Sequence, residues 1–275
     1  MRAEAVARRA KFPARWPDSL GEDATIYREP TVNVTADNVA RYEQPPMQLF
    51  RGERQLLDRY LAPDMRVLDL GSGSGRVTKH IAAAGARVWA CDLNATALQV
   101  LRRSLHPSSV VSVILADARE LPVPDCSFDM VVFAFNGIDF LHPESERFRA
   151  LEEISRVLRP GGYFVFSSHN RLGMLLTPRG LRSRNAWRWR LRFALSGIPT
   201  KRYFLDTNGL LLYQAVPAEV VDQVNAHGGF RFLCAQNRSG HVNAMPLISL
   251  FSAWPSYVFI KEGFNADAAG PRPVG

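Results

Sequence analysis

The sequence is poor in cysteine and contains no long hydrophobic run. Its three cysteines, Cys91, Cys126 and Cys234, are odd in number and widely spaced, which argues against a disulfide framework and against a zinc site. No apolar segment approaches the ~20 residues needed to cross a bilayer. The basic residues 1–15 lack the apolar core of a signal peptide. We therefore expect no metal site, no transmembrane segment and a reducing, cytoplasmic environment.

A second absence is local, because residues 171–205 contain neither aspartate nor glutamate. This segment carries eight arginines and one lysine, whereas the whole chain of 275 residues has a net charge of +8. The excess of positive charge is therefore confined to one segment. Three interpretations remain open: a cap that selects an anionic ligand through its arginines, a solvated surface, or a docking surface for nucleic acid or an anionic membrane.

The most informative pattern lies in residues 67–76, where a short apolar run leads to an acid and then to glycine at every second position. Residues 67–70 are expected to form a buried strand and residues 77–84 the start of a helix. The three glycines allow the connecting turn to approach a ligand closely. Such a strand–turn–helix unit binds a nucleotide-like cofactor at the carboxyl edge of a parallel sheet.

The spacing of the motifs distinguishes between cofactors. A dinucleotide fingerprint would have its third glycine at position 76, where this chain has Arg76. The Asp-x-Gly-x-Gly-x-Gly pattern of residues 69–75 instead resembles the first motif of the class I S-adenosylmethionine-dependent methyltransferases. Four further segments resemble later motifs of that family in the same order: residues 87–92, 113–122, 127–136 and 156–166. Together the five matches cover residues 65–170.

The resemblance implies an α/β fold with a doubly wound, seven-stranded, mostly parallel sheet and an antiparallel last strand. Residues 230–236 and 256–260 are expected to form the sixth and seventh strands as an antiparallel hairpin at the sheet edge. A helix over residues 217–227 should precede them and end at a Gly-Gly pair. A helix over residues 44–61 should precede the first strand.

The basic segment is compatible with either kind of secondary structure. Its residues 187–193 alternate between basic and apolar as a strand would, while arginines four residues apart fit a helix. We favour the helix, because the expected sheet offers no partner strand. We divide the chain into five parts: an N-terminal cap segment (residues 1–40), a cofactor-binding core (41–170), a basic cap insertion over the acceptor pocket (171–210), the completion of the sheet (211–264) and a disordered tail (265–275).

The resemblance implies S-adenosyl-L-methionine as the cofactor. A carboxylate at Asp92 can accept both ribose hydroxyls, although NAD enzymes place an acid at this position as well. In the family, an acid at the position of Asp117 binds the adenine amino group. The expected cofactor-binding residues are Tyr42, Asp69, Gly71, Ser72, Gly73, Gly75, Asp92, Leu93, Asp117, Ala118 and Phe135.

Residues that act on the acceptor should follow the fourth and fifth strands, where the pocket opens. His169 and His142 are the candidate general bases, since imidazole titrates near neutrality. We favour His169, because it follows directly on the fifth strand, and Asp139 can orient either imidazole. The expected substrate-binding residues are Asn136, Asn170, Arg171 and Tyr213.

These residues predict methyl transfer to an oxygen or nitrogen atom of a small metabolite, such as a secondary metabolite, a sugar or an amino-acid derivative. The cap interpretation makes the acceptor anionic. One alternative is an RNA methyltransferase that holds nucleic acid with the arginine-rich segment, but Phe-Asn-Gly at 135–137 replaces the box typical of base-amino methylation. The other is a non-catalytic binding protein on the same fold, against which the acids at positions 69, 92 and 117 argue. The oligomeric state cannot be read from the sequence.

Overall fold

A computed structural model describes residues 48–106, 109–176, 202–205, 211–241, 248 and 252–263. The N-terminal segment 1–40, most of the basic insertion and the C-terminal tail lie outside these ranges, so their expected roles stay predictions. None of the helices within the described ranges is both long and apolar enough to span a membrane.

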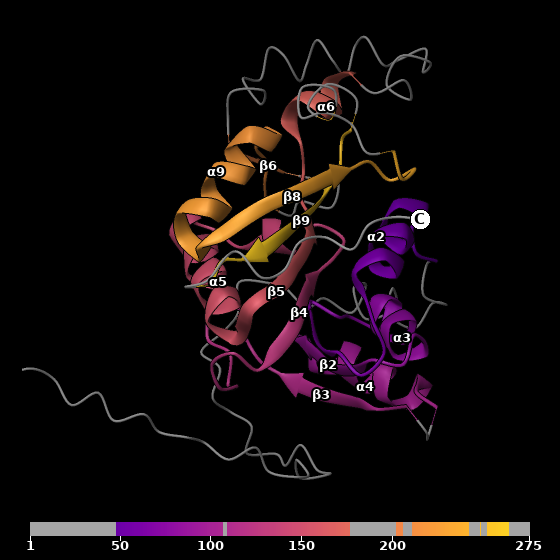
Figure 1. Cartoon of the computed structure of the whole chain (residues 1–275). Helices are drawn as coiled ribbons and strands as arrows, with labels where there is room; N and C mark the ends of the chain where they lie inside the picture. The colour runs from indigo at the N-terminus through magenta and orange to yellow at the C-terminus, as the bar shows by residue number, and fades with distance from the viewer. Residues whose placement is uncertain are drawn as a thin grey trace, which may run out of the picture.

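A seven-stranded sheet with the order β3-β2-β1-β4-β5-β9-β8 forms the centre of the protein (Figure 1). Its strands are β1 (Arg66–Leu70), β2 (Arg87–Asp92), β3 (Val111–Leu115), β4 (Phe128–Phe133), β5 (Leu158–Ser167), β8 (Phe230–Gln236) and β9 (Ser256–Lys261). Neighbours from β3 to β5 pair in parallel, and β9 pairs antiparallel with both β5 and β8. The predicted sheet is confirmed, including its antiparallel last strand.

Helices cover both faces of this sheet, with α2, α3 and α4 on one side and α5 and α9 on the other (Figure 1). The helices are α2 (Arg51–Tyr60), α3 (Arg76–Ala83), α4 (Ala95–Ser104), α5 (Glu144–Val157), α6 (Arg171–Leu176) and α9 (Pro217–Gly228), with a 3₁₀ turn, η1 (Gly137–Phe140), after β4. As predicted, α9 ends against a glycine in the left-handed conformation, Gly229 with φ of 60°.

Alternating side chains of the central strands divide the core into two layers. In β1, Val67 packs with Leu56 of α2 and Ile81 of α3, whereas the next residue, Leu68, packs with the side of the sheet that α5 and α9 cover. This is the two-residue period of a strand that is buried on both faces. Both layers consist of buried apolar side chains, and the layer that α5 and α9 cover also contains buried aromatic rings. This close packing holds the carboxyl ends of the strands in fixed positions.

The described residues of the basic segment include one helix and one strand. Residues 171–176 are helical, and β6 (Tyr203–Leu205) pairs antiparallel with β7 (Leu211–Tyr213) in a separate two-stranded sheet. The helix that the sequence favours around residues 187–193 lies outside the described ranges, because residues 177–201 are not among them, and it stays a prediction.

Candidate active site

The glycine-rich turn between β1 and α3 is fastened to the end of β2. The backbone N–H of Ser72 donates to the carbonyl of Cys91 at 3.1 Å, and that of Gly73 donates to Asp92 Oδ2 at 2.8 Å. Gly71, Gly73 and Gly75 have φ of 62°, 54° and 88°, in the left-handed region that a Cβ disfavours. The sequence therefore needs glycine here to bring the turn against Asp92.

Asp92 has unused acceptor capacity. Its Oδ1 accepts from the N–H of Asn94 at 2.8 Å and its Oδ2 from the N–H of Gly73, while a carboxylate oxygen can accept two hydrogen bonds. Burial raises the pKa of Asp92, and the backbone hydrogen bonds oppose that rise. The arrangement suits two adjacent hydroxyl donors, which is the requirement of a ribose.

Asp69 lies beneath the turn and is 1% exposed. Its Oδ2 accepts from Thr78 Oγ1 of α3 at 2.6 Å, so the carboxylate ties the end of β1 to the first turns of the helix. Burial raises the pKa of Asp69 to about 7, against the lowering effects of the Thr78 hydrogen bond and of the positive charge of Arg76. Asp69 thus braces the glycine turn from below.

Asp117, the residue expected at the adenine edge, follows β3 and is held by its own neighbour. Arg119 donates from Nε to Asp117 Oδ1 at 2.9 Å and to Oδ2 at 3.0 Å, and its backbone N–H also donates to Oδ1 at 2.9 Å. Burial raises the pKa of Asp117, but the Arg119 hydrogen bonds outweigh burial and the net shift is downward. The side chain is therefore fixed as a carboxylate. Ala118 packs against the core, and Leu93 follows Asp92 half-buried.

Phe135 projects from the end of β4 beside the glycine turn. Its backbone is left-handed with φ of 54°, and it is 49% exposed, which is unusual for a phenylalanine. Its ring stacks on Phe50 at 6.1 Å and lies 5.1 Å from the guanidinium carbon of Arg76. Phe135 thus links the glycine turn to the residues after β4. Tyr42, the other expected aromatic, lies outside the described residues.

Asp139 and His169 meet at the carboxyl ends of β4 and β5. The backbone N–H of His169 donates to Asp139 Oδ2 at 2.6 Å, and its Nδ1 lies 2.8 Å from the same oxygen. Because a carboxylate only accepts hydrogen bonds, the neutral imidazole in this position carries its proton on Nδ1 and its lone pair on Nε2. The sequence predicted that Asp139 orients one of the two histidines, and the geometry pairs it with His169.

The lone pair of His169 faces a polar and aromatic environment. Asn136 Nδ2 lies 3.4 Å from His169 Nε2, and the Asn136 backbone N–H donates to Ser167 Oγ at 2.8 Å. The imidazole meets the rings of Phe204 and Trp254 edge to face at 5.3 and 6.3 Å. Asp139, Asn136 and the two aromatic rings together fix the orientation of the imidazole.

His142, the other candidate base, precedes Pro143 at the end of the turn that follows β4. Within the described part of the chain, both hydrogen bonds that Asp139 Oδ2 accepts come from His169, and none comes from the ring of His142. The orienting carboxylate therefore serves His169 alone among the two histidines.

Three of the expected substrate-binding residues have structural contacts instead. Asn170 is fully buried, and its Nδ2 donates to the carbonyl of Ser252 at 2.7 Å. Arg171 donates to Glu219 Oε1 at 2.7 Å and so connects α6 to α9. Tyr213 is fully buried behind the site, with its ring 4.5 Å from the guanidinium carbon of Arg147. Burial of Asn170 and Tyr213 and the ion pair of Arg171 give these residues structural contacts, and their substrate-binding roles stay predictions.

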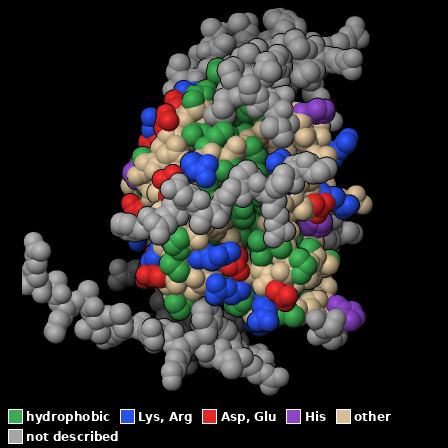
Figure 2. Space-filling model, viewed as in Figure 1, with side chains coloured by type: hydrophobic (Ala, Val, Ile, Leu, Met, Phe, Trp, Pro, Cys, Tyr) green, Lys and Arg blue, Asp and Glu red, His purple; other side chains and the backbone are tan. Residues whose placement is uncertain are grey.

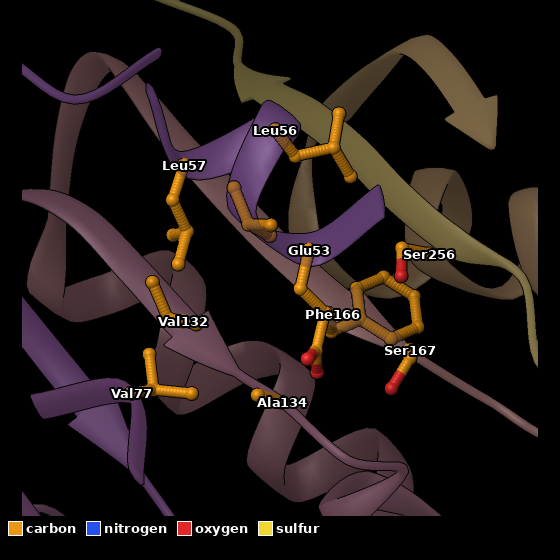
Figure 3. A pocket seen from close by; sticks show the side chains of 10 residues that line it. Glu53, Leu56, Leu57, Val77, Val132, Ala134, Phe166, Ser167 and Ser256 are labelled. Atoms are coloured by element: carbon orange, nitrogen blue, oxygen red, sulfur yellow. The ribbon is translucent and has the colours of Figure 1, made fainter. Parts of the chain in front are cut away.

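The sequence analysis missed Glu53, which α2 places beside the glycine turn. Its carboxylate accepts from Arg76 at 2.6 and 2.8 Å, and it borders a cavity of about 20 Å³ between α2 and the strands β4, β5 and β9. Figure 3 shows the carboxylate pointing from α2 toward Ala134, with Phe166 and Ser167 beside it. A signal was present, since Glu53 shares a helix face with Leu56 and Leu57, and an acid on an apolar face is unusual.

Arg238 was also missed. Its guanidinium carbon lies 4.0 Å from the ring centre of Phe50 and 3.9 Å from that of Trp254, so it bridges the start of α2 and the segment before β9. The backbone carbonyl of Arg238 accepts from the N–H of Gly52 at 2.8 Å. Nothing in the local sequence pattern indicates this contact, because its partners come from both ends of the described chain.

Comparisons with known proteins agree with this geometry. Residues 68–166 match a family model described as a methyltransferase domain. A demethylmenaquinone methyltransferase from Clavibacter sepedonicus is 37% identical over 115 residues, which is 42% of this chain and 45% of that protein. The chain thus matches less than half the length of this curated relative.

Two solved structures have the same fold. An S-adenosylmethionine-dependent methyltransferase from Methanosarcina mazei matches with a TM-score of 0.59 at 20% identity, over 78% of this chain and 99% of its own. The 1,6-didemethyltoxoflavin-N1-methyltransferase from Burkholderia thailandensis, solved with 1,6-didemethyltoxoflavin and S-adenosylhomocysteine, matches with a TM-score of 0.54 at 19% identity, over 78% of each chain. The order of its motifs, its sheet topology and the match of residues 68–166 to the family model identify these residues as a methyltransferase domain of the class I S-adenosylmethionine-dependent type.

Proposed function

We propose that this protein transfers the methyl group of S-adenosylmethionine to an oxygen or nitrogen atom of a small molecule. The observation that carries the proposal is the Asp139–His169 pair, whose Nε2 lies 3.4 Å from Asn136 Nδ2, just after β4. Phe135 and Arg76 connect this position to the glycine turn. A proton acceptor and a cofactor turn therefore share one edge of the sheet, as a transfer reaction requires.

The described residues fit the cofactor. The glycine turn would hold the methionine portion, Asp92 would accept the ribose hydroxyls, and Asp117 with Ala118 would border the adenine. When bound, S-adenosylmethionine supplies a methyl group already activated on a sulfonium sulfur. Ser72 Oγ is buried without a hydrogen-bond partner among the described residues, which leaves the turn with a polar group for the cofactor to satisfy.

His169 acts as the general base in this proposal. Its Nε2 takes the proton of an acceptor hydroxyl or amine as the new bond to the methyl group forms, and Asp139 stabilises the imidazolium that results. Such a base contributes roughly 10²–10⁴-fold to the rate. Holding the acceptor in line with the sulfonium contributes as well, since positioning alone can supply several kcal/mol.

The comparisons support an acceptor of metabolite size, because the relative and one of the neighbours are named for small molecules. The alternative of a nucleic-acid substrate rested on the arginine-rich segment, most of which lies outside the described residues. On the face drawn in Figure 2, acidic and basic side chains of the described residues are interspersed rather than gathered into one basic field. We favour the small molecule on the comparisons.

The first test is calorimetric titration with S-adenosylmethionine and S-adenosylhomocysteine. Wild type should bind both, and Asp92→Asn should bind at least tenfold more weakly, because one acceptor for the ribose is lost. Asp58→Asn is the matched control, since Asp58 is on the exposed side of α2 and contacts His80. Absence of binding by folded wild type would overturn the proposal. Formation of S-adenosylhomocysteine with fractionated metabolites then identifies the acceptor.

A further inference from the structure

Arg147 of α5 is a fully buried arginine directly behind the candidate base. Its Nη1 donates to Asp139 Oδ1 at 2.9 Å and to the backbone carbonyl of Ile138 at 3.0 Å. The side chains of Arg147 and Asp139 are both 0% exposed. The pair is therefore removed from solvent, where two opposite charges interact strongly and an unpaired one is very costly.

The remaining contacts of Arg147 make Asp139 its anionic partner. The guanidinium carbon lies 4.5 Å from the ring centre of Tyr213, and Nε and Nη2 have no hydrogen-bond partner among the described residues. Burial of a guanidinium with two unsatisfied nitrogens costs free energy of folding, whereas an apolar side chain in the same space would carry no such penalty. The cost indicates that the charge has a use beyond packing.

The two oxygens of Asp139 have separate partners. Oδ1 accepts from Arg147 Nη1 and from Ser168 Oγ at 2.7 Å, while Oδ2 accepts from the backbone N–H and from Nδ1 of His169. One oxygen is thus anchored to α5 and to the end of β5, and the other is left to the histidine. Rotation of the carboxylate would break bonds on both sides.

We infer that Arg147 is a positioning residue for His169: it holds the Asp139 carboxylate in one rotation, with Oδ2 toward the histidine, so that the imidazole proton stays on Nδ1 and the lone pair stays on Nε2. The inference rests on the proposed function, in which that lone pair accepts the substrate proton. Without the guanidinium, Asp139 Oδ1 loses its hydrogen bond to α5, so the carboxylate can turn and no longer specifies a single imidazole tautomer.

The test reads the tautomer of His169 directly by long-range ¹H–¹⁵N NMR on protein labelled at its histidines. The chain has six histidines, so the spectrum is simple, and His169→Gln assigns the signal. Wild type should show the Nδ1–H pattern. Arg147→Met and Arg147→Gln should lose this single pattern and show the Nε2–H form beside it, whereas Arg147→Lys, which keeps a cationic donor, should retain the wild-type pattern.

Arg149→Met is the matched control, because Arg149 is on the same helix, exposed and paired with Glu146. It should leave the His169 pattern unchanged. A folded Arg147→Met or Arg147→Gln protein with the wild-type pattern would overturn the inference, as would an Nε2–H pattern in wild type itself. Titration of the same samples with S-adenosylhomocysteine separates the two proposals, since failed cofactor binding by wild type bears on the function and an unchanged tautomer bears on Arg147.

If neither Arg147→Met nor Arg147→Gln folds, the inference is tested on the wild-type protein. The ¹⁵Nη1 resonance of Arg147 should show a coupling across the hydrogen bond to the ¹³Cγ of Asp139 and slow exchange with solvent. Fast exchange with no such coupling would mean that the guanidinium does not anchor the carboxylate, and the inference would be wrong.

Discussion

Arg76, the first residue of α3, is joined to Glu53 of α2 by two parallel hydrogen bonds of 2.6 and 2.8 Å. The two side chains are 14% and 10% exposed, so this is a mostly buried, bidentate pair. Glu53 Oε2 also accepts from the N–H of Phe50 at 3.0 Å. The pair therefore fastens the start of α2 to the helix that follows the glycine turn.

Breaking this pair should destabilise the protein. We expect Arg76→Met to lower the free energy of unfolding by roughly 3 kcal/mol, because it leaves the Glu53 carboxylate buried without its cation. Urea denaturation measures the effect. Arg66→Met is the control: the Arg66–Asp129 pair is 3.6 Å long and Arg66 is 44% exposed, so its loss should cost less than about 1 kcal/mol. Equal decreases in the free energy of unfolding of the two variants would show that burial of the Glu53–Arg76 pair does not add to stability.

Asp69 should make stability depend on pH in an uncommon direction for a carboxylate. Its pKa is raised to about 7 in the folded protein, so between about pH 4 and pH 7 the folded state binds the proton more tightly than the unfolded state does. Stability from this group is therefore highest at acidic pH and falls as pH rises to about 7, beyond which it is constant. The total loss is of the order of 2–4 kcal/mol.

The comparison of wild type with Asp69→Asn isolates this effect. Asparagine keeps an oxygen for the Thr78 hydroxyl but cannot ionise. The difference in unfolding free energy, wild type minus variant, should fall across pH 4–7 and level off above. Curves that run parallel over this range would show that Asp69 does not titrate in it.

The elements around Asp69 were predictable because their signals are local. An apolar run, three glycines that require left-handed backbone and a following amphipathic stretch specify β1, the turn and α3 without reference to the rest of the chain. The meeting of Asp139 and His169 was predictable for a topological reason, since β4 and β5 are neighbours and their carboxyl ends must be close. The tautomer of His169 could not be predicted from the sequence, because it depends on which hydrogen bonds the ring makes.

Features that depend on contacts between distant residues could not be predicted from the local sequence pattern. His169 and Asn170 are consecutive, yet one faces Asn136 and the other is buried against Ser252, because the direction of a side chain after a strand end is set by its tertiary partners. The strand β6 was not predicted, because its partner β7 begins only after the segment treated as the insertion. Glu53 was overlooked because its role depends on its ion pair with Arg76, which lies 23 positions later.

Gly75 should resist substitution for two reasons. Its φ is 88°, and a Cβ at this position would clash with Leu101 Cδ1 of α4. We expect Gly75→Ala to cost about 2–5 kcal/mol, from backbone strain together with overpacking, and to weaken binding of S-adenosylhomocysteine.

Gly161→Ala separates the two contributions to the Gly75 effect. Gly161 has φ of 76°, and a Cβ added there would meet no atom of the described residues within 4 Å, so the substitution introduces the backbone strain alone. It should cost about 1–2 kcal/mol and leave cofactor affinity unchanged. If Gly75→Ala were no more harmful than Gly161→Ala, the packing of the turn against α4 would be unimportant.

The last prediction decides between the two histidines. His169→Gln should reduce kcat for the acceptor found in the metabolite screen by roughly 10²–10³-fold, because no base remains to take the substrate proton. Affinity for S-adenosylhomocysteine should be unchanged, since the hydrogen bonds of the His169 ring within the described ranges go to Asp139 and Asn136 rather than to the glycine turn. His142→Gln should retain kcat within about twofold, because Asp139 orients His169 instead and no base function is expected of His142. Loss of activity in His142→Gln with retention in His169→Gln would reverse the assignment of the base. Retention in both would mean that the acceptor reacts without one, and that the enzyme works by positioning alone.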